Sequence, residues 1–198
     1  LYGKERRSLE LDENEKRTTA YHESGHAIVG LVVKHADPVD KVTIIPRGMS
    51  LGATMFLPRK NRVSYWKNEL IDQLAMLMGG RVAEEIFVGD VSSGARQDIE
   101  MATGIARSMV CEWGMSDKLG VVAYDERSES GQYLGMSGYH EKKYSEDTAK
   151  AIDDEVRKIL EDAHEAARRI VSENREKLEL MAQMLMEFET LEAEDVQE

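Results

Sequence analysis

Residues 21–27 read Tyr21-His22-Glu23-Ser24-Gly25-His26-Ala27. On a helix, residues four apart lie on the same face, one turn above the other, so the imidazoles of His22 and His26 can point at one cation. Zinc takes imidazole nitrogens at about 2.0–2.1 Å, which suits this spacing. Glu23 is next along the helix, where its carboxylate can reach a water bound to the metal and act as a general base. The stretch therefore predicts a hydrolytic zinc site.

The flanks of this stretch favour a helix over residues 13–34, because apolar positions recur at helical spacing and no proline occurs before Pro38. Such a helix has a simpler interpretation, in which His22 and His26 are core histidines on an amphipathic face. That interpretation is the weaker one, since two buried histidines flanking a glutamate would all need hydrogen-bond partners.

The composition is that of a globular protein. Of the 198 residues, 41% are hydrophobic, which is enough for a core. We expect the single cysteine, Cys111, to be a small core residue rather than a nucleophile. The net charge of −12 disfavours a nucleic-acid-binding surface, because an acidic chain repels phosphate. The sequence contains no run of about 18 apolar residues, so it predicts no membrane-spanning helix. The start at Leu1 suggests a piece of a longer protein.

Two short runs of strand-forming residues follow the first helix. Residues 39–45 are rich in β-branched side chains and end at Pro46, and residues 52–57 end at Pro58. We expect them to pair as a small sheet with an open outer edge. An edge strand beside a hydrolytic site can pair with an extended peptide. The candidate substrate-binding residues are therefore Gly52, Ala53, Thr54 and Met55.

The rest of the chain is predicted to form helices and loops. Helical spacing covers residues 64–78, and Gly79-Gly80 is expected to interrupt this helix before it resumes over 81–87. A loop over 89–98 precedes a helix that ends near Trp113. Loops are predicted over 114–144, with 119–124 as a candidate short strand. Two helices, at 145–171 and 174–187, are predicted to form a C-terminal hairpin with charged, solvated outer faces.

Other ionisable residues each have a plain structural interpretation. Asp98 lies in the first turn of its predicted helix, where a carboxylate can cap the helix or balance its dipole. Glu84 and Glu85 are adjacent acids that suit a solvated face. Three histidines lie outside any ligand spacing and are expected to be structural or exposed: His35, His140 and His164.

Five motifs occur in order along the chain. They are Ala20-Tyr21-His22-Glu23-Ser24-Gly25-His26-Ala27, Ile45-Pro46-Arg47-Gly48 with Leu51-Gly52, Gly79-Gly80-Arg81-Val82-Ala83-Glu84-Glu85, Ser92-Ser93-Gly94-Ala95-Arg96-Gln97-Asp98 and Trp113-Gly114-Met115-Ser116. With these motifs, nearly the whole chain resembles the peptidase domain of FtsH-type ATP-dependent membrane zinc metalloproteases. Two departures are small, since Ser24 stands where the family more often has alanine and Ser92-Ser93 where it more often has threonines.

The resemblance implies a fold and a set of site residues. The fold is a mainly α-helical metallopeptidase domain over residues 13–198, with a small β-sheet or hairpin and a C-terminal helical hairpin. His22, His26 and Asp98 would be the ligands of Zn²⁺. Glu23 would be the catalytic base, and Glu84 would support the site from behind a ligand.

The resemblance also implies a larger parent protein. Transmembrane helices and an AAA+ ATPase module would precede Leu1, with residues 1–12 as the linking arm, and the parent would assemble as a homo-hexamer. The domain would lie on the cytoplasmic side of a membrane, or on the matrix or stromal side in an organelle, and would meet the membrane only through the missing segments. ATP would serve only the AAA+ module, because this chain has no Gly-x-x-x-x-Gly-Lys-[Ser/Thr] phosphate loop. The implied activity is hydrolysis of unfolded or motor-delivered proteins by a zinc-activated water, in protein quality control.

From the residues alone, two alternatives stay open. A metallopeptidase of another lineage would take a glutamate, Glu84 or Glu85, as its third ligand. A structural or adaptor domain would use the histidines to bind metal only for stability, or not at all. Glu23 argues against the second alternative, since a structural site has no use for a base.

Overall fold

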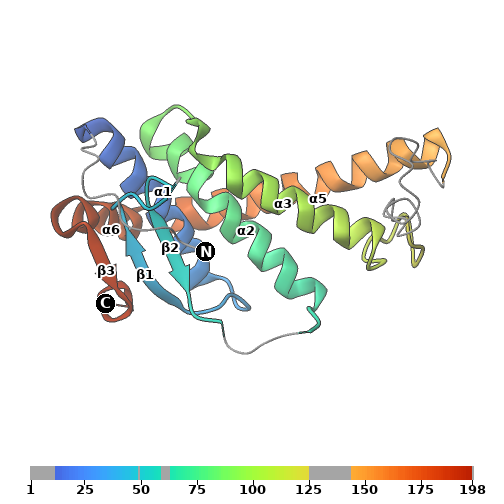
Figure 1. Cartoon of the computed structure of the whole chain (residues 1–198), viewed down its shortest axis with the longest axis horizontal. Coiled ribbons are helices and arrows are strands. Elements are labelled where there is room, and N and C mark those ends of the chain that lie inside the picture. Colours follow the sequence, from blue (N-terminus) through green and yellow to red (C-terminus); the bar gives the residue numbers. More distant parts are fainter. Residues whose placement is uncertain (1–11, 49, 59–62, 125–143, 198) are drawn as a thin grey trace. The chain divides into compact units, whose positions relative to one another are not determined.

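The computed structural model describes residues 12–48, 50–58, 63–124 and 144–197 (Figure 1). In chain order its elements are α1 (Glu13–Val32), β1 (Val39–Thr43), β2 (Ala53–Phe56), α2 (Lys67–Ala83), the π-helix η1 (Glu84–Val88), the 3₁₀-helix η2 (Ser93–Ala95), α3 (Arg96–Cys111), α5 (Glu146–Glu173), α6 (Arg175–Phe188), β3 (Thr190–Glu192) and α7 (Ala193–Gln197). The predicted fold class, mainly helical with a small sheet and C-terminal helices, is confirmed. The predicted arm at 1–12, apart from Asp12, and the residue His140 lie outside the described residues.

The chain divides into two compact units. The first contains the chain up to Met101 and again from Asp162 onward, and the second is Ala102–Glu161. The boundaries between the units fall inside α3 and inside α5. No helix among the described residues is both long enough and apolar enough to cross a membrane.

Helix α1 forms the centre of the first unit. The Asp12 side chain caps it by accepting a hydrogen bond from the backbone N–H of Glu15 at 2.7 Å. Glu13 and Glu15 add negative charge to the first turn, where the helix dipole favours it. Every residue over 22–30 is buried, because α2, α6 and the sheet all contact this helix. The histidine motif therefore lies inside the unit.

The sheet has three antiparallel strands in the order β2-β1-β3. The sequence predicted the first two strands but missed β3, which is too short to show an alternating pattern. Glu189 has a left-handed backbone, with φ 64°, and turns the chain out of α6. Its carbonyl accepts the backbone N–H of Ile44 at 2.9 Å, so that β3 is brought alongside β1. In the described part of the chain β2 has one strand neighbour, and its other edge is open as predicted.

Helix α2 runs through Gly79 and Gly80 without a break, so the predicted interruption there is wrong. The two glycines serve packing instead. A Cβ added at Gly79 would lie 2.5 Å from the carbonyl oxygen of Gly25 in α1, and a Cβ at Gly25 would meet the carbonyl oxygen of Gly79. Helices α1 and α2 therefore cross with their backbones in contact, which only glycine allows.

The π-helix η1 is fixed by an aromatic contact. The ring of Phe87 stacks on that of Tyr21 in α1, with 5.0 Å between the centroids and 17° between the planes. The guanidinium of Arg17 lies 5.0 Å from the Tyr21 ring centre, and that of Arg175 lies 4.9 Å from the Phe87 ring centre. The ring stacking joins η1 to α1, and the contact of Arg175 with Phe87 joins η1 to the start of α6.

The second unit has its own small core, made of Ala106, Val110, Ile152 and Val156, and Cys111 packs against it as predicted. The candidate strand at 119–124 is not formed, because the described residues of this unit contain no strand with which it could pair. The chain instead turns at Gly114 and Gly120, both with positive φ. The backbone N–H of Tyr124 then donates to the Cys111 carbonyl at 2.7 Å, which ends the turn against α3.

The crossing of α1 and α2 gives a testable contrast between two glycines. Gly79→Ala should lower the free energy of unfolding by about 1–3 kcal/mol, because a methyl group there must push the two backbones apart. Gly104, exposed in α3 with nothing within 4 Å of an added Cβ, is the matched control. Gly104→Ala should raise the free energy of unfolding by about 0.5–1 kcal/mol. Urea denaturation measures both, and equal effects of the two substitutions would contradict the close crossing.

Candidate functional site

Three side chains from two helices of the first unit converge on one point. His22 and His26 come from α1, and Asp98 comes from the first turn of α3. Asp98 Oδ2 lies 3.1 Å from His22 Nε2 and 3.0 Å from His26 Nε2, and the two Nε2 atoms are 3.0 Å apart. The two histidines are buried and Asp98 is partly buried. The structure thus brings together the three residues that the sequence analysis named as ligands.

The far nitrogens of the two imidazoles are held by separate partners. His26 Nδ1 lies 2.8 Å from the carbonyl oxygen of Met76, and His22 Nδ1 lies 3.0 Å from Glu84 Oε2. A carbonyl oxygen can only accept, so His26 Nδ1 must carry the hydrogen. The Glu84 carboxylate favours the same tautomer in His22. When the two imidazoles are neutral, each therefore presents an Nε2 lone pair to the point where the three side chains meet.

The chemistry of this donor set fits zinc. Two nitrogen lone pairs and a carboxylate oxygen about 3 Å apart repel one another unless a cation or protons lie between them. A tetrahedral zinc with ligands at about 2.0–2.1 Å would separate neighbouring ligand atoms by about 3.3–3.4 Å, close to the spacing here. Three protein ligands would leave a fourth position open, as in catalytic rather than structural zinc sites.

The electrostatics of the cluster favour protonated imidazoles beside ionised carboxylates. Burial lowers the pKa of His22, but hydrogen bonds with Asp98 and Glu84 outweigh it and raise this pKa to about 10. Burial and the nearby charge of His22 lower the pKa of His26, but the hydrogen bond with Asp98 and the negative charges of Asp98 and Glu23 together outweigh them, so this pKa is also raised. Burial raises the pKa of the Asp98 carboxyl group, but the hydrogen bonds with His22 and His26 and the charges of these imidazoles outweigh burial and lower this pKa. Burial also raises the pKa of Glu84, but its hydrogen bonds with His22 and Ser92 and the charge of His22 outweigh burial and lower this pKa. A cation would take the place of these protons.

Gly80 makes room for the meeting point. A Cβ at this position would lie 2.6 Å from His22 Nε2 and 2.7 Å from His26 Nε2. Any other residue would therefore fill the space between the imidazoles. Sequence reasoning missed this role, although two consecutive glycines inside a helical pattern are a signal of close packing.

Glu84 lies behind His22 rather than beside the three donor atoms. It is 1% exposed, and its Oε1 accepts hydrogen bonds from the hydroxyl of Ser92 and from the Ser92 backbone N–H, the latter at 3.2 Å. Its other oxygen, Oε2, is the one that faces His22 Nδ1. The sequence analysis quoted Ser92 within a motif but gave it no role.

Glu85 points away from the cluster. Its carboxylate contacts His164 Nε2 at 3.0 Å, Arg168 Nη1 at 3.3 Å and Arg81 Nε at 3.3 Å. It is therefore a partly buried, paired residue rather than a solvated one, and His164 is structural. The geometry favours Asp98 over either glutamate as the third donor.

Glu23, the candidate base, is 7% exposed and is held by β2. The Thr54 hydroxyl lies 2.6 Å from Glu23 Oε2 and 3.0 Å from the Glu23 backbone oxygen. Of the residues predicted to bind substrate, Gly52 and Ala53 are buried, and Met55, like Thr54, is half-buried. The side chain of Thr54 thus faces α1, and only its backbone is available to a substrate.

The backbone of β2 alternates between β1 and the open edge. Thr43 of β1 is paired with Ala53, and the Ile44 N–H points the opposite way, to Glu189. The Leu57 N–H donates to the Pro38 carbonyl at 2.8 Å, which is again on the β1 side. By this alternation, the backbone groups of Thr54 face the open edge.

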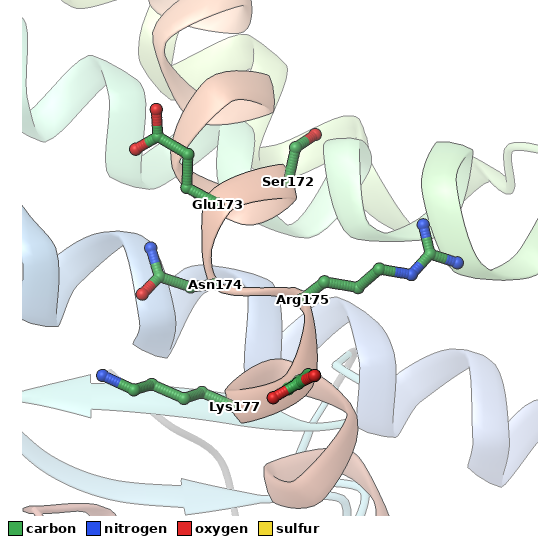
Figure 2. Close-up of a pocket in the computed structure, with 6 residues that line it drawn as sticks. Ser172, Glu173, Asn174, Arg175 and Lys177 are labelled. Atoms are coloured by element: carbon green, nitrogen blue, oxygen red, sulfur yellow. The ribbon is translucent and has the colours of Figure 1, made fainter.

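Another hollow, at the turn between α5 and α6, is unrelated to the cluster. It is lined by Ser172, Glu173, Asn174, Arg175, Glu176 and Lys177. Figure 2 shows Glu173, Asn174 and Lys177 directed to one side of the chain and Ser172 and Arg175 to the other, so these side chains do not converge on one point.

Comparisons with known proteins point to a family of zinc metalloproteases. Residues 9–198 match the family model of peptidase family M41. The chain is 75% identical over 198 residues to an ATP-dependent zinc metalloprotease FtsH of Protochlamydia amoebophila, and 69% identical to that of Chlamydia trachomatis serovar L2. Both alignments cover 100% of this chain and 22% of the relative. An ATP-dependent zinc metalloprotease FtsH 2 of Methylacidiphilum infernorum is 53% identical over 197 residues, which is 31% of its length. The chain thus spans between a fifth and a third of these relatives.

The two carboxylates near His22 should differ in their effect on zinc. Asp98→Ala should give a largely zinc-free protein, because it removes one of three converging donor atoms. Glu84→Gln should retain zinc with about 10- to 100-fold weaker affinity, the usual cost of losing a partner behind a ligand. Zinc content after dialysis and competition with a chelator measure both effects.

Neighbouring carboxylates provide matched controls. Glu100→Ala removes an exposed carboxylate from the same helix as Asp98, and Glu85→Gln alters the residue next to Glu84. Neither control should change zinc affinity. Stoichiometric zinc in Asp98→Ala together with loss of zinc in Glu84→Gln would assign the third ligand to the glutamate instead.

Proposed function

Because this chain belongs to peptidase family M41, we propose that it is the peptidase domain of an ATP-dependent zinc metalloprotease and hydrolyses peptide bonds of unfolded or motor-delivered proteins. The supporting observation is the convergence of two Nε2 lone pairs and one carboxylate oxygen, next to the buried Glu23. A site with three donors and an adjacent base suits hydrolysis, whereas a structural site closes with four ligands.

The residues divide the work of binding and catalysis. His22, His26 and Asp98 hold the zinc ion, while Glu84 and the Met76 carbonyl keep both imidazoles in the tautomer that leaves Nε2 free. Zinc, when bound, lowers the pKa of water and polarises the carbonyl of a peptide bond. The buried setting of the histidines limits access of bulk water to the site, which strengthens these electrostatic effects.

Glu23 carries the proton in this reaction. As water adds to the carbonyl carbon, Glu23 accepts a proton from that water, and it then donates the proton to the leaving amine nitrogen as the carbon–nitrogen bond breaks. One carboxylate thus serves first as base and then as acid. Its position next to His22 on α1 suits both steps.

The open edge of β2 is the proposed binding site for substrate backbone. Gly52, Ala53, Thr54 and Met55 form or border this edge. An extended peptide that adds to the edge pairs through main-chain groups, so recognition tolerates many side chains. This selects unfolded polypeptides, because a folded protein rarely offers a free extended strand.

The remaining proposals concern the parent protein. An AAA+ module of the same parent chain delivers substrate and is the only part that uses ATP, and residues 1–12 link it to the peptidase domain at 13–198. The parent is a homo-hexamer in protein quality control. It is anchored in a membrane by segments outside this chain, and the peptidase domain lies on the cytoplasmic, matrix or stromal side. The names of the relatives support the ATP dependence.

Glu23→Gln tests the assigned base. The amide keeps the shape of the side chain but cannot accept a proton, so zinc content and the fold should be retained while casein cleavage falls by about 10²- to 10⁴-fold. Glu85→Gln, which makes the same change at the residue that follows Glu84, is the control and should cleave casein at the wild-type rate. Cleavage by Glu23→Gln at that same rate would remove Glu23 from the mechanism.

The edge-strand proposal is tested on the substrate. A series of fluorescent peptides, each with one backbone amide N-methylated, should show kcat/KM reduced about 2- to 10-fold for each lost hydrogen bond near the cut. Side-chain changes at the same positions should matter less. A proline at Thr54 is a poorer test, since it would also remove the hydroxyl from Glu23. Peptides that tolerate N-methylation throughout would place substrate binding elsewhere.

A further inference from the structure

The side chain of Glu23 lies in a niche formed by β2. Gly52, which comes just before the strand, and Thr54 and Phe56 within it are alternate residues that all face α1. A Cβ at Gly52 would come 3.2 Å from Glu23 Cγ and 2.7 Å from the Thr43 carbonyl oxygen, so the stem of Glu23 passes close to the backbone of this segment. The carboxylate at the end of that stem then meets the Thr54 hydroxyl at 2.6 Å.

The contact with Thr54 distinguishes the two carboxylate oxygens of Glu23. The hydroxyl donates to Oε2, so Oε1 is the oxygen that remains to face the reacting water. A glutamate has three rotatable bonds, and a fixed contact at one oxygen restricts all three. A base must lie within hydrogen-bond reach of the proton it accepts, and errors of about 1 Å in such placement can cost about 10²-fold in rate.

The hydroxyl also has a second acceptor within reach. Thr54 Oγ1 lies 3.0 Å from the backbone oxygen of Glu23, in addition to its contact with the carboxylate of the same residue. The single hydroxyl hydrogen can therefore find a partner on Glu23 in either of two directions. The Thr54 hydroxyl therefore has an acceptor on Glu23 whether or not the carboxylate carries a proton.

We propose that Thr54 is the positioning residue for Glu23: its hydroxyl holds one carboxylate oxygen so that the other is directed at the reacting water. This proposal rests on the proposed peptidase function. It gives β2 two tasks at one residue, because the Thr54 backbone groups face the open edge while the side chain holds the base. A peptide that pairs with this edge would also steady the strand that positions Glu23.

Three variants separate this role from a purely structural one. Thr54→Val keeps the shape of the side chain and removes the hydroxyl, and Thr54→Ser keeps the hydroxyl. Thr43→Val is the matched control, since Thr43 is a buried threonine of the same sheet whose hydroxyl bonds to Glu189 and Thr190 rather than to Glu23. All three are measured at one pH for kcat and KM on a fluorescent peptide, and for zinc content.

We expect Thr54→Val to lower kcat about 10-fold, with KM and zinc content within about twofold of wild type. Thr54→Ser should restore kcat to within about threefold of wild type. Thr43→Val should leave kcat unchanged. In the Glu23→Gln background, Thr54→Val should cause no further loss, because its effect passes through the carboxylate.

A readout independent of catalysis completes the test. In protein labelled with ¹³C at glutamate, the Glu23 Cδ resonance is the one that disappears in Glu23→Gln. It should shift in Thr54→Val and remain near its wild-type position in Thr54→Ser and Thr43→Val.

Two kinds of negative result are distinguishable. An unchanged Glu23 resonance and kcat in Thr54→Val, or losses that add to those of Glu23→Gln, would overturn the role of Thr54 while the wild type still cleaves peptide. Failure of zinc-loaded wild-type protein to cleave any peptide would instead remove the proposed function, and the resonance would still decide whether Thr54 holds Glu23.

Discussion

The backbone contact between Gly25 and Gly79 is the constraint on which the candidate site depends. Helices with ordinary side chains pack about 8–10 Å apart, and these two glycines allow α1 and α2 to come closer. The close crossing brings the Met76 carbonyl to 2.8 Å from His26 Nδ1 and puts Gly80 opposite the two Nε2 atoms. A side chain at either crossing position would move α2 outward. The tautomer of His26 and the space for a cation would then be lost together.

The cluster at the crossing buries several ionisable groups, which is costly unless each is paired. His22 is the partner of two carboxylates, since Asp98 contacts its Nε2 and Glu84 contacts its Nδ1. Glu84 is satisfied in turn by the hydroxyl and N–H of Ser92. A polar network of this kind stabilises the fold only when it is complete. Segments far apart in the sequence must therefore be in place before any one of these charges is compensated.

Much of this arrangement could be predicted from the sequence, because the histidine spacing and the apolar periodicity of the helices are local signals. What could not be predicted depends on partners distant in sequence. Gly79-Gly80 looks like a helix break until α1 is placed against it. The strand β3 exists because β1 supplies its hydrogen bonds, and residues 119–124 form no strand because they lack such a partner. The pairing of Thr54 with Glu23 likewise could not be predicted, because the alternating pattern of a strand does not indicate which helix the strand will face.

The C-terminal helices α5 and α6, whose outer faces the charge pattern predicts to be solvated, also contribute to the site. The η1 segment carries Glu84 and Glu85 side by side, with one carboxylate facing His22 and the other facing His164 and Arg168 of α5. The same segment is fixed at Phe87 by rings and guanidinium groups from α1 and α6. The contacts of Phe87 with Tyr21 and Arg175 resist a shift of η1 toward solvent, and so resist displacement of Glu84. Arg175 of α6 therefore helps, through η1 and Glu84, to hold the orientation of a ligand imidazole.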